Sequence, residues 1–293
     1  MHDAELTLRL AAALGIDIDR PALETLFRGL EPTLTEWSIN AADDPRGSLR
    51  FGSWVAPGDA ALGEAVRTLG GPACVALTSQ VPHDDLEGVG LGFRAGARPC
   101  FRWWQLARPG AGEGLFAAAR AAWGGSDVPA ADLDELSEQC GGPRRATALG
   151  IEAVDGHMIR RTVYFNVLSA WAAVKILERI GALSTLPAQQ FFRGLLGMNG
   201  DAAQGWPKVW IGRSFGRGGG WKFYWFARGA LERPDDAALL DLVGAGPGAR
   251  EAYAALAADS AAGAPLVQLV GLTFRDDAPP ETPPTWTLYL ARR

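Results

Sequence analysis

The chain alternates pairs of helix-like segments with pairs of strand-like segments, and this order recurs about five times along its 293 residues. The predicted hairpins cover residues 34–56, 88–107, 146–167, 208–227 and 266–293. In each of them, strand-like segments with alternating apolar residues flank a turn-forming segment. Apolar residues spaced by three and four before and between the hairpins predict helices. A repeat of this size indicates an architecture and not a single local motif.

Ten antiparallel strands joined in this way need partners for their edges, and the helix pairs need an apolar surface to cover. A closed ten-stranded barrel with the helices packed outside satisfies both requirements. The expected fold class is therefore α+β, a single domain over residues 1–293 built from five ααββ repeats. Because a barrel of ten strands is wider than the eight that side chains can fill, we expect a lumen.

Composition and net charge indicate a soluble globular protein and argue against nucleic-acid-binding and membrane-spanning classes. The chain is 48% hydrophobic and 21% charged, which is ordinary for a soluble globular protein. Its net charge of −5 argues against a broad nucleic-acid-binding face, and no apolar run reaches membrane-spanning length. Three dispersed cysteines give no disulfide framework, which favours a cytoplasmic setting.

A second pattern recurs inside the hairpins. The second strand of a hairpin carries a basic or small polar residue and, two positions later, a large aromatic one. Residues two apart face the same side of a strand, so the pair projects together. The pairs are Arg102 with Trp104, Thr162 with Tyr164, Lys222 with Tyr224, and Thr287 with Tyr289; Arg50 occupies the first position in the first hairpin, and Arg160 shares a face with Thr162.

Two orientations of these pairs are possible. Facing outward, they would form a solvated stripe, and Lys222 would reach water past its aromatic neighbours. The opposite faces of the same strands carry Phe101, Trp103, Phe223 and Trp225, which suit contact with helices better. The inward orientation is therefore favoured. Cations converging at low effective dielectric suit a diphosphate, and aromatic faces beside them suit a carbocation. Such a site is suited to ionising an allylic diphosphate.

With these features the sequence resembles the aromatic prenyltransferases of the ABBA type, whose barrel consists of five ααββ repeats. The resemblance covers essentially the whole chain in element order. It rests on the [KR]-x-[YW] strand pattern, VYFN at 163–166 and VGLTF in the last hairpin. The segments LEPTLTEWSINAADDPRGSLRFGS and LVGLTF are most similar to the bacterial branch, which includes the cyanobactin peptide prenyltransferases.

The resemblance implies roles for individual residues. Glu36 matches the glutamate that orients the acceptor and accepts its proton, and we expect neighbouring cations to keep it ionised or nearly so. The expected diphosphate-binding residues are Arg50, Arg102, Arg160, Lys222 and Thr287. The expected shield around the allyl cation consists of Trp104, Tyr164, Tyr224 and Tyr289. Trp37, Trp54 and Trp210 are candidates for the acceptor pocket, with plain core as the alternative that we expect for at least two of them.

The sequence also departs from the family pattern. Thr162 and Thr287 replace basic or amide groups, a loss for which Arg160 and Arg213 are candidates to compensate. Arg50 stands where the magnesium-dependent phenol enzymes have an aspartate, which argues against a required metal there. No metal site or cofactor is predicted, while Mg²⁺ carried by the diphosphate stays open.

The expected partners are an allylic diphosphate and an aromatic acceptor, either a small molecule or a peptide side chain. The expected activity is transfer of a dimethylallyl or longer prenyl group to an indole, phenol or peptide side chain. The alternative is a non-catalytic β-barrel carrier that binds a hydrophobic aromatic ligand.

Overall fold

Ten strands form a closed antiparallel barrel in which each strand pairs with its neighbours in the sequence and β1 pairs with β10. The structure, a computed structural model, describes residues 2–27, 32–41, 49–59, 61–78, 80–94, 100–123, 128–167, 170–181, 209–227, 234–260, 264–279 and 282–292. The strands are β1 (Leu34–Asn40), β2 (Arg50–Val55), β3 (Leu86–Arg94), β4 (Cys100–Ala107), β5 (Ala146–Val154), β6 (His157–Val167), β7 (Val209–Gly216), β8 (Gly220–Phe226), β9 (Val267–Arg275) and β10 (Thr285–Arg292).

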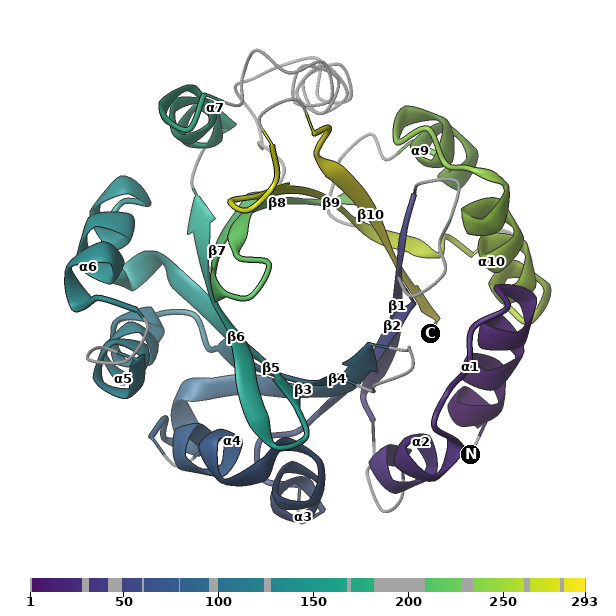
Figure 1. Ribbon diagram of the computed structural model, residues 1–293, viewed down its shortest axis with the longest axis horizontal. Coiled ribbons are helices and arrows are strands. Elements are labelled where there is room, and N and C mark those ends of the chain that lie inside the picture. Colours follow the sequence, from purple (N-terminus) through teal and green to yellow (C-terminus); the bar gives the residue numbers. More distant parts are fainter. Residues whose placement is uncertain are drawn as a thin grey trace.

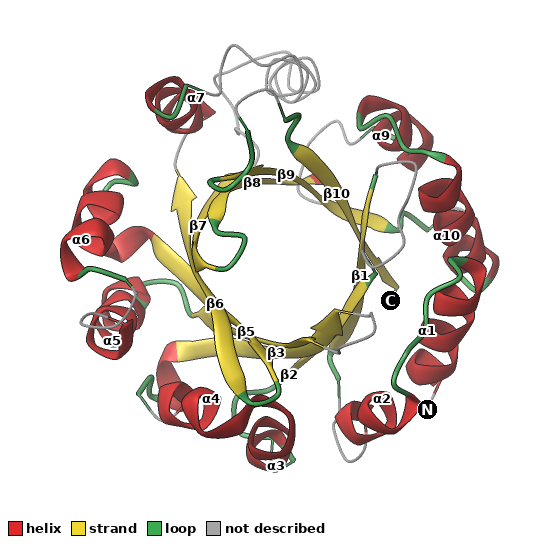
Figure 2. Ribbon diagram, in the orientation of Figure 1, coloured by secondary structure: helices red, strands yellow, loops and turns green. Residues whose placement is uncertain are grey.

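Helices surround the barrel on its outside, as the view along the barrel shows (Figures 1 and 2). They are α1 (His2–Ala13), α2 (Arg20–Phe27), α3 (Leu62–Ala65), α4 (Gly71–Thr78), α5 (Gly112–Trp123), α6 (Ala130–Gln139), α7 (Ala170–Arg179), α9 (Asp236–Leu242) and α10 (Pro247–Ala258). A π-helical segment, Val66–Gly70, joins α3 to α4. None of the described helices is both long and apolar enough to cross a membrane.

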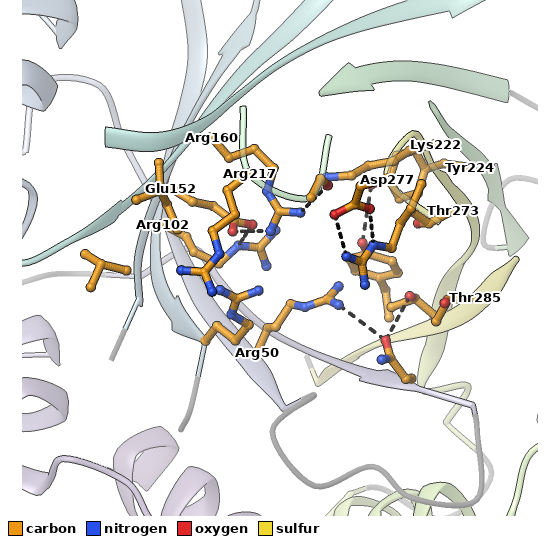
Figure 3. A pocket seen from close by; sticks show the side chains of 18 residues that line it. Arg50, Arg102, Glu152, Arg160, Arg217, Lys222, Tyr224, Thr273, Asp277 and Thr285 are labelled. Atoms are coloured by element: carbon orange, nitrogen blue, oxygen red, sulfur yellow. Dashed lines mark hydrogen bonds and ion pairs between the residues drawn. The ribbon is translucent and has the colours of Figure 1, made fainter. Parts of the chain in front are cut away.

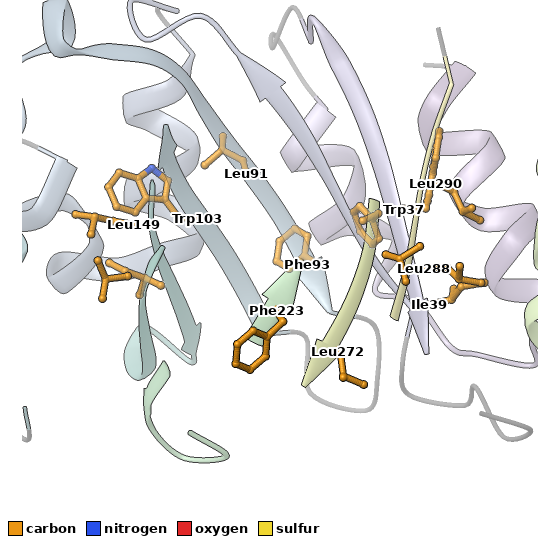
Figure 4. Packing of buried hydrophobic residues seen from close by; sticks show 14 of the residues in the cluster. Trp37, Ile39, Leu91, Phe93, Trp103, Leu149, Phe223, Leu272, Leu288 and Leu290 are labelled. Atoms are coloured by element: carbon orange, nitrogen blue, oxygen red, sulfur yellow. The ribbon is translucent and has the colours of Figure 1, made fainter. Parts of the chain in front are cut away.

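The strong alternation of side chains places the main hydrophobic core between the barrel wall and the helices. Trp37, Trp103, Phe223 and Leu288 are fully buried members of this core (Figure 4). A second, smaller cluster lies inside the barrel and contains Tyr164, Tyr224, Tyr289 and Ala148. The barrel therefore has an apolar outer face beneath the helices and a separate aromatic layer within its lumen.

Glycines on neighbouring strands make room for the lumen aromatics. Gly150 and Gly212 pair with Thr162 and Tyr164 of β6, respectively. A Cβ atom on Gly212 would lie 2.8 Å from the Tyr164 ring, and one on Gly150 would lie 3.0 Å from the ring of Trp104. These glycines are needed for close approach, since any larger residue would push an aromatic ring out of the layer.

The hairpins predicted from the sequence are confirmed, with boundaries that differ by a few residues. β3 begins at Leu86, two residues before the predicted hairpin, and the glycine-rich segment 88–92 is strand. Residues 216–220 form the turn between β7 and β8, in which Gly218 has φ 65°. The sequence DDPRG at 43–47 predicts the turn of the first hairpin, and apolar spacing over residues 187–197 predicts a helix. Both segments lie outside the described residues.

Candidate active site

The lumen holds two chambers that meet at a shared wall. The basic chamber, of about 1050 Å³, lies at the end where the hairpins turn, and Arg217 and Gly218 of the β7–β8 turn line its mouth. The aromatic chamber, of about 680 Å³, extends toward the end where the strands lead into the helices. Three side chains line both of them: Arg102, Tyr224 and Tyr289.

Seven basic side chains and two acidic ones line the basic chamber in the part of the chain that the structure describes (Figure 3). They come from seven strands and two hairpin turns. The basic residues are Arg50, Arg94, Arg102, Arg160, Arg217, Lys222 and Arg275, and the acidic ones are Glu152 and Asp277. Because Asp277 is bound by Arg275 at 2.9 and 2.8 Å near the rim, Glu152 is the acid that lies deep within the chamber. This charge balance suits a polyanion.

Lys222 on β8 points its ammonium group into this chamber. Its side chain is only 7% exposed, and within the described part of the chain the ammonium group has no hydrogen-bond or ion-pair partner. Burial holds the pKa of Lys222 well below its usual range, and the nearby Arg160 guanidinium lowers it further. An anionic ligand would strongly stabilise the charged form of a buried amine of this kind.

Arg50 on β2 faces the same chamber beside polar groups of β1 and β10. Its guanidinium donates to Asn40 Oδ1 at 3.3 Å, and Thr287 Oγ1 donates to the same oxygen at 3.4 Å. Burial lowers the pKa of Arg50, and the positive charge of Arg102 lowers it further. The predicted diphosphate-binding residues Arg50, Arg102, Arg160, Lys222 and Thr287 are thus all brought to one chamber.

The aromatic layer lies immediately below these cations. The ring centroids of Tyr164 and Tyr224 are 5.8 Å apart, and those of Tyr224 and Tyr289 are 5.7 Å apart. Trp104 continues the layer and stacks on Trp54 at 6.3 Å. The four predicted shield residues therefore lie together, as expected from their spacing in the sequence.

Arg102 joins the two chambers. Its guanidinium lies 4.4 Å above the ring of Trp104, within cation–π range, and its Nε donates to Glu152 Oε1 at 3.1 Å. Burial alone would lower the pKa of Arg102, but the Glu152 carboxylate, together with smaller contributions from Tyr289, Tyr164 and Cys100, raises it. The Arg102 side chain thus contacts an aromatic face and forms an ion pair where the two chambers meet.

Glu36 on β1 lines the aromatic chamber, on the far side of the aromatic layer from most of the cations. Burial raises the pKa of its carboxyl from 4.5 to about 7, although the charge of Arg102 lowers it in part. The expectation that neighbouring cations keep Glu36 ionised is therefore wrong, because the loss of hydration outweighs the attraction. With this pKa Glu36 changes protonation near neutral pH, which suits a group that accepts a proton.

Two sequence-predicted residues point away from the lumen. Trp37 is fully buried on the outer face of β1, where its indole N–H donates to Thr7 Oγ1 of α1 at 2.9 Å. Arg213 faces outward on β7, where it pairs with Asp276 at 2.7 Å and lies 5.3 Å from the ring of Trp221. Trp37 is therefore core and not an acceptor-pocket residue, and Arg213 does not compensate for a missing cation. In both cases strand alternation decides the outcome.

Trp54 and Trp210, in contrast, both line the aromatic chamber. Trp210 packs against Phe226 with ring centroids 4.8 Å apart, and against Tyr164 at 6.4 Å. The expectation that at least two of the three tryptophans are core is thus wrong, since Trp37 alone is.

Trp37 and Trp54 provide a matched pair of substitutions. Trp54→Ala is expected to raise KM for the acceptor about tenfold, because it removes a chamber wall, and to leave thermal stability nearly unchanged. Trp37→Phe is expected to cost about 1–3 kcal/mol of unfolding free energy, since Thr7 loses a buried donor. Acceptor titrations and thermal melts of both variants measure these effects. A higher acceptor KM in Trp37→Phe than in Trp54→Ala would contradict this assignment.

The most consequential residue that sequence reasoning missed is Glu152 on β5. It lies directly opposite Arg102 of β4 and Arg160 of β6. The cation–aromatic pattern recurs on the second strand of the hairpins, whereas Glu152 lies on a first strand. Stepping by two from Gly150 identifies it as a lumen residue once the register is known. Other lining residues missed from the sequence are Asn40, Arg94, Asn166, Arg217, Gln268 and Arg275.

The described residues contain no group of three or more His, Cys, Asp or Glu side chains arranged to hold a metal ion. In the basic chamber, Glu152 is engaged by two guanidinium groups and Asp277 by one. Guanidinium and ammonium groups do not ligate metal ions, so the chamber walls do not fit a metal held by the protein alone.

No protein-family model matches the sequence, and no curated protein matches it. Solved structures do match it in fold over nearly its full length. The 5-dimethylallyltryptophan synthase from Streptomyces coelicolor is 19% identical with a TM-score of 0.65, and the match covers 98% of this chain and 95% of that one. The chain has the prenyltransferase-barrel fold.

Further structures with this fold are also similar over nearly the full chain. The 6-dimethylallyltryptophan synthase from Micromonospora olivasterospora, in complex with DMASPP and Trp, is 20% identical with a TM-score of 0.65 over 99% of this chain and 96% of that one. AnaPT from Neosartorya fischeri is 13% identical with a TM-score of 0.59 over 98% and 91% of the two chains. These likenesses establish the shared architecture.

Proposed function

We propose that this protein is an aromatic prenyltransferase that moves a dimethylallyl group from an allylic diphosphate to an electron-rich aromatic ring. The observation that carries the proposal is the contact between the two chambers. An excess of cations lies directly above a layer of tyrosine and tryptophan rings, and one of them, Lys222, has no ion-pair partner among the described residues. Glu36 lies beyond that layer.

The reaction begins at the wall shared by the chambers. Arg50, Arg102, Arg160 and Lys222 bind the diphosphate, and Thr287 hydrogen-bonds to it. These charges stabilise the negative charge that develops as the allylic carbon–oxygen bond breaks, with the electron pair going to the diphosphate. Fixed cations in a water-poor lumen achieve this without reorganising at the moment of reaction.

The allyl cation is then held among aromatic faces. Trp104, Tyr164, Tyr224 and Tyr289 attract it through their ring electrons and keep water from adding to it. The acceptor ring, bound beside Trp54 and Trp210, donates an electron pair and forms the new bond. The carboxylate of Glu36 accepts the proton that the acceptor loses, which leaves a prenylated aromatic product and free diphosphate.

An indole is the acceptor we favour. Two of the fold neighbours are described as complexes with tryptophan and a dimethylallyl diphosphate analogue. The aromatic chamber is of a size that takes a bicyclic ring. A phenol, or an aromatic side chain in a peptide, presents the same kind of nucleophilic ring and is included among the acceptors to be tested.

The test is incubation with dimethylallyl diphosphate and a panel of acceptors: tryptophan, simple indoles, phenols, and short peptides containing tryptophan or tyrosine. The expected result is a mass gain of one C5H8 unit on an acceptor, with release of diphosphate in equal amount. A protein that binds these aromatics but forms no product and releases no diphosphate would instead be a carrier. Reactions without acceptor control for simple hydrolysis of the donor.

A further inference from the structure

Glu152 has no acidic counterpart in the other hairpins. Each hairpin has an equivalent lumen position on its first strand. It lies two residues nearer the turn than the residue that pairs with the cation position of the second strand. These positions are Asn40, Arg94, Glu152, Ser214 and Thr273. Four of the five are neutral or basic, as a chamber for an anion requires. The carboxylate in the third hairpin breaks this rule at the centre of the basic chamber.

The Glu152 carboxylate is fully engaged by two cations of that chamber. Its side chain is buried, Arg102 Nε donates to Oε1 at 3.1 Å, and Arg160 Nη2 donates to Oε2. Arg160 also donates to the carbonyl oxygen of Gly218 at 3.2 Å. Figure 3 shows Glu152 between the two guanidinium groups, facing the same cavity as Lys222.

Burial would raise the pKa of Glu152, but Arg102, Arg160, Lys222 and Arg94 together hold it well below its usual range. The carboxylate is therefore ionised at neutral pH. It presents oxygen acceptors and negative charge to the same guanidinium groups that a diphosphate would use. A carboxylate fixed in this position also repels any anion that enters.

We propose that Glu152 is a built-in counter-ion that occupies Arg102 and Arg160 while the chamber is empty and yields these donors to the diphosphate when it binds. This inference rests on the proposed function, because it takes the basic chamber to be the diphosphate site. The exchange forms and breaks no covalent bond. Two guanidinium groups change their partner from the Glu152 carboxylate to the diphosphate.

The proposed exchange predicts how loss of the Glu152 charge changes the stability of the empty protein and its affinity for diphosphate. Without Glu152, the buried Arg102 and Arg160 lose their anionic partner in the empty chamber, which destabilises the free protein. When diphosphate binds to a protein that lacks the Glu152 charge, the diphosphate neutralises these cations, and no carboxylate repels it. Removing the charge of Glu152 should therefore weaken the empty fold and strengthen diphosphate binding. A residue that merely orients Arg102 and Arg160 predicts the opposite change in affinity, because its loss would disorder the donors.

The test uses inorganic diphosphate as the probe and calorimetric titration and thermal melts as the readouts. Glu152→Gln keeps the shape of the side chain and removes its charge, and Glu251→Gln on the exposed face of α10 is the matched control. We expect Glu152→Gln to bind diphosphate at least about tenfold more tightly than the wild type. We also expect its melting temperature to be lower without diphosphate and to rise more when diphosphate is added. Glu251→Gln should behave as the wild type does.

Weaker binding of diphosphate by Glu152→Gln, or unchanged binding, would overturn the counter-ion role. If the variant fails to fold alone, refolding it with diphosphate decides the matter: recovery of the fold supports the role, and failure to recover contradicts it. A wild-type protein that does not bind diphosphate would instead refute the proposed function. The two ideas therefore fail in different measurements.

Discussion

Replacing Lys222 with methionine is expected to lower kcat/KM for dimethylallyl diphosphate by about 10²–10³-fold. Methionine keeps the approximate length of the side chain and removes the ammonium group that points into the basic chamber. A positive charge in a desolvated site stabilises a departing diphosphate more than it would in water, so its loss raises the barrier to ionisation. Steady-state kinetics with saturating acceptor measure the effect.

The control for this substitution is Lys175→Met on the exposed face of α7. Proton uptake provides a second readout. Because burial depresses the pKa of Lys222 in the empty chamber, a bound diphosphate should raise this pKa and favour uptake of a proton. Titrations with diphosphate in buffers of different ionisation enthalpy should show less proton uptake in Lys222→Met than in the wild type. A kcat/KM within threefold of the wild type would remove Lys222 from the diphosphate site.

Replacing Glu36 with glutamine is expected to lower kcat by about 10²–10⁴-fold, because the amide cannot accept the proton that the acceptor loses. Since the pKa of Glu36 is raised to about 7, the wild-type kcat/KM for the acceptor should rise about tenfold per pH unit below pH 7 and level off above it. The residual activity of Glu36→Gln should lack this inflection. Rate measurements from pH 5.5 to 9 separate the two profiles.

Stability should respond to Glu36 in the opposite direction. A carboxyl whose pKa is raised on folding binds its proton more tightly in the folded state, so its contribution to stability is lost as pH rises through about 7. Glu36→Gln is therefore expected to melt no lower than the wild type at pH 8, and Glu178→Gln on α7 serves as the surface control. An active Glu36→Gln with an unchanged pH profile would show that another group accepts the proton.

The architecture was predictable because its signals are local. Hydrophobic alternation marks a strand within a few residues, and glycine-rich segments such as residues 216–220 mark the turns. The recurrence of the hairpins then leaves barrel closure as the arrangement that pairs every strand. The same alternation placed Lys222 with Tyr224, and Thr287 with Tyr289, on one face of their strands. The structure confirms that this face lines the lumen.

The candidate site was predictable only where it followed that repeat. The pairs of a polar and an aromatic residue share a position in four of the five hairpins, so the orientation expected for one strand applies to the others. Trp37 and Trp54 lack such a guide, because each is a large aromatic on a strand of the first hairpin with alternating neighbours. Which of them faces inward follows from the helix that covers β1, where Thr7 of α1 accepts the indole hydrogen bond of Trp37.

By itself, the sequence determined the five hairpins, the faces of their strands and the charged and aromatic residues that line one face. Period and spacing are properties of a single chain segment, so neighbouring residues suffice to establish them. Only the tertiary structure decided which other side chains those residues contact. Closure of the barrel sets the register between strands, which places Glu152 between Arg102 and Arg160. Enclosure within the barrel removes water from Glu36 and raises its pKa, an effect that depends on every surrounding strand and on no local motif.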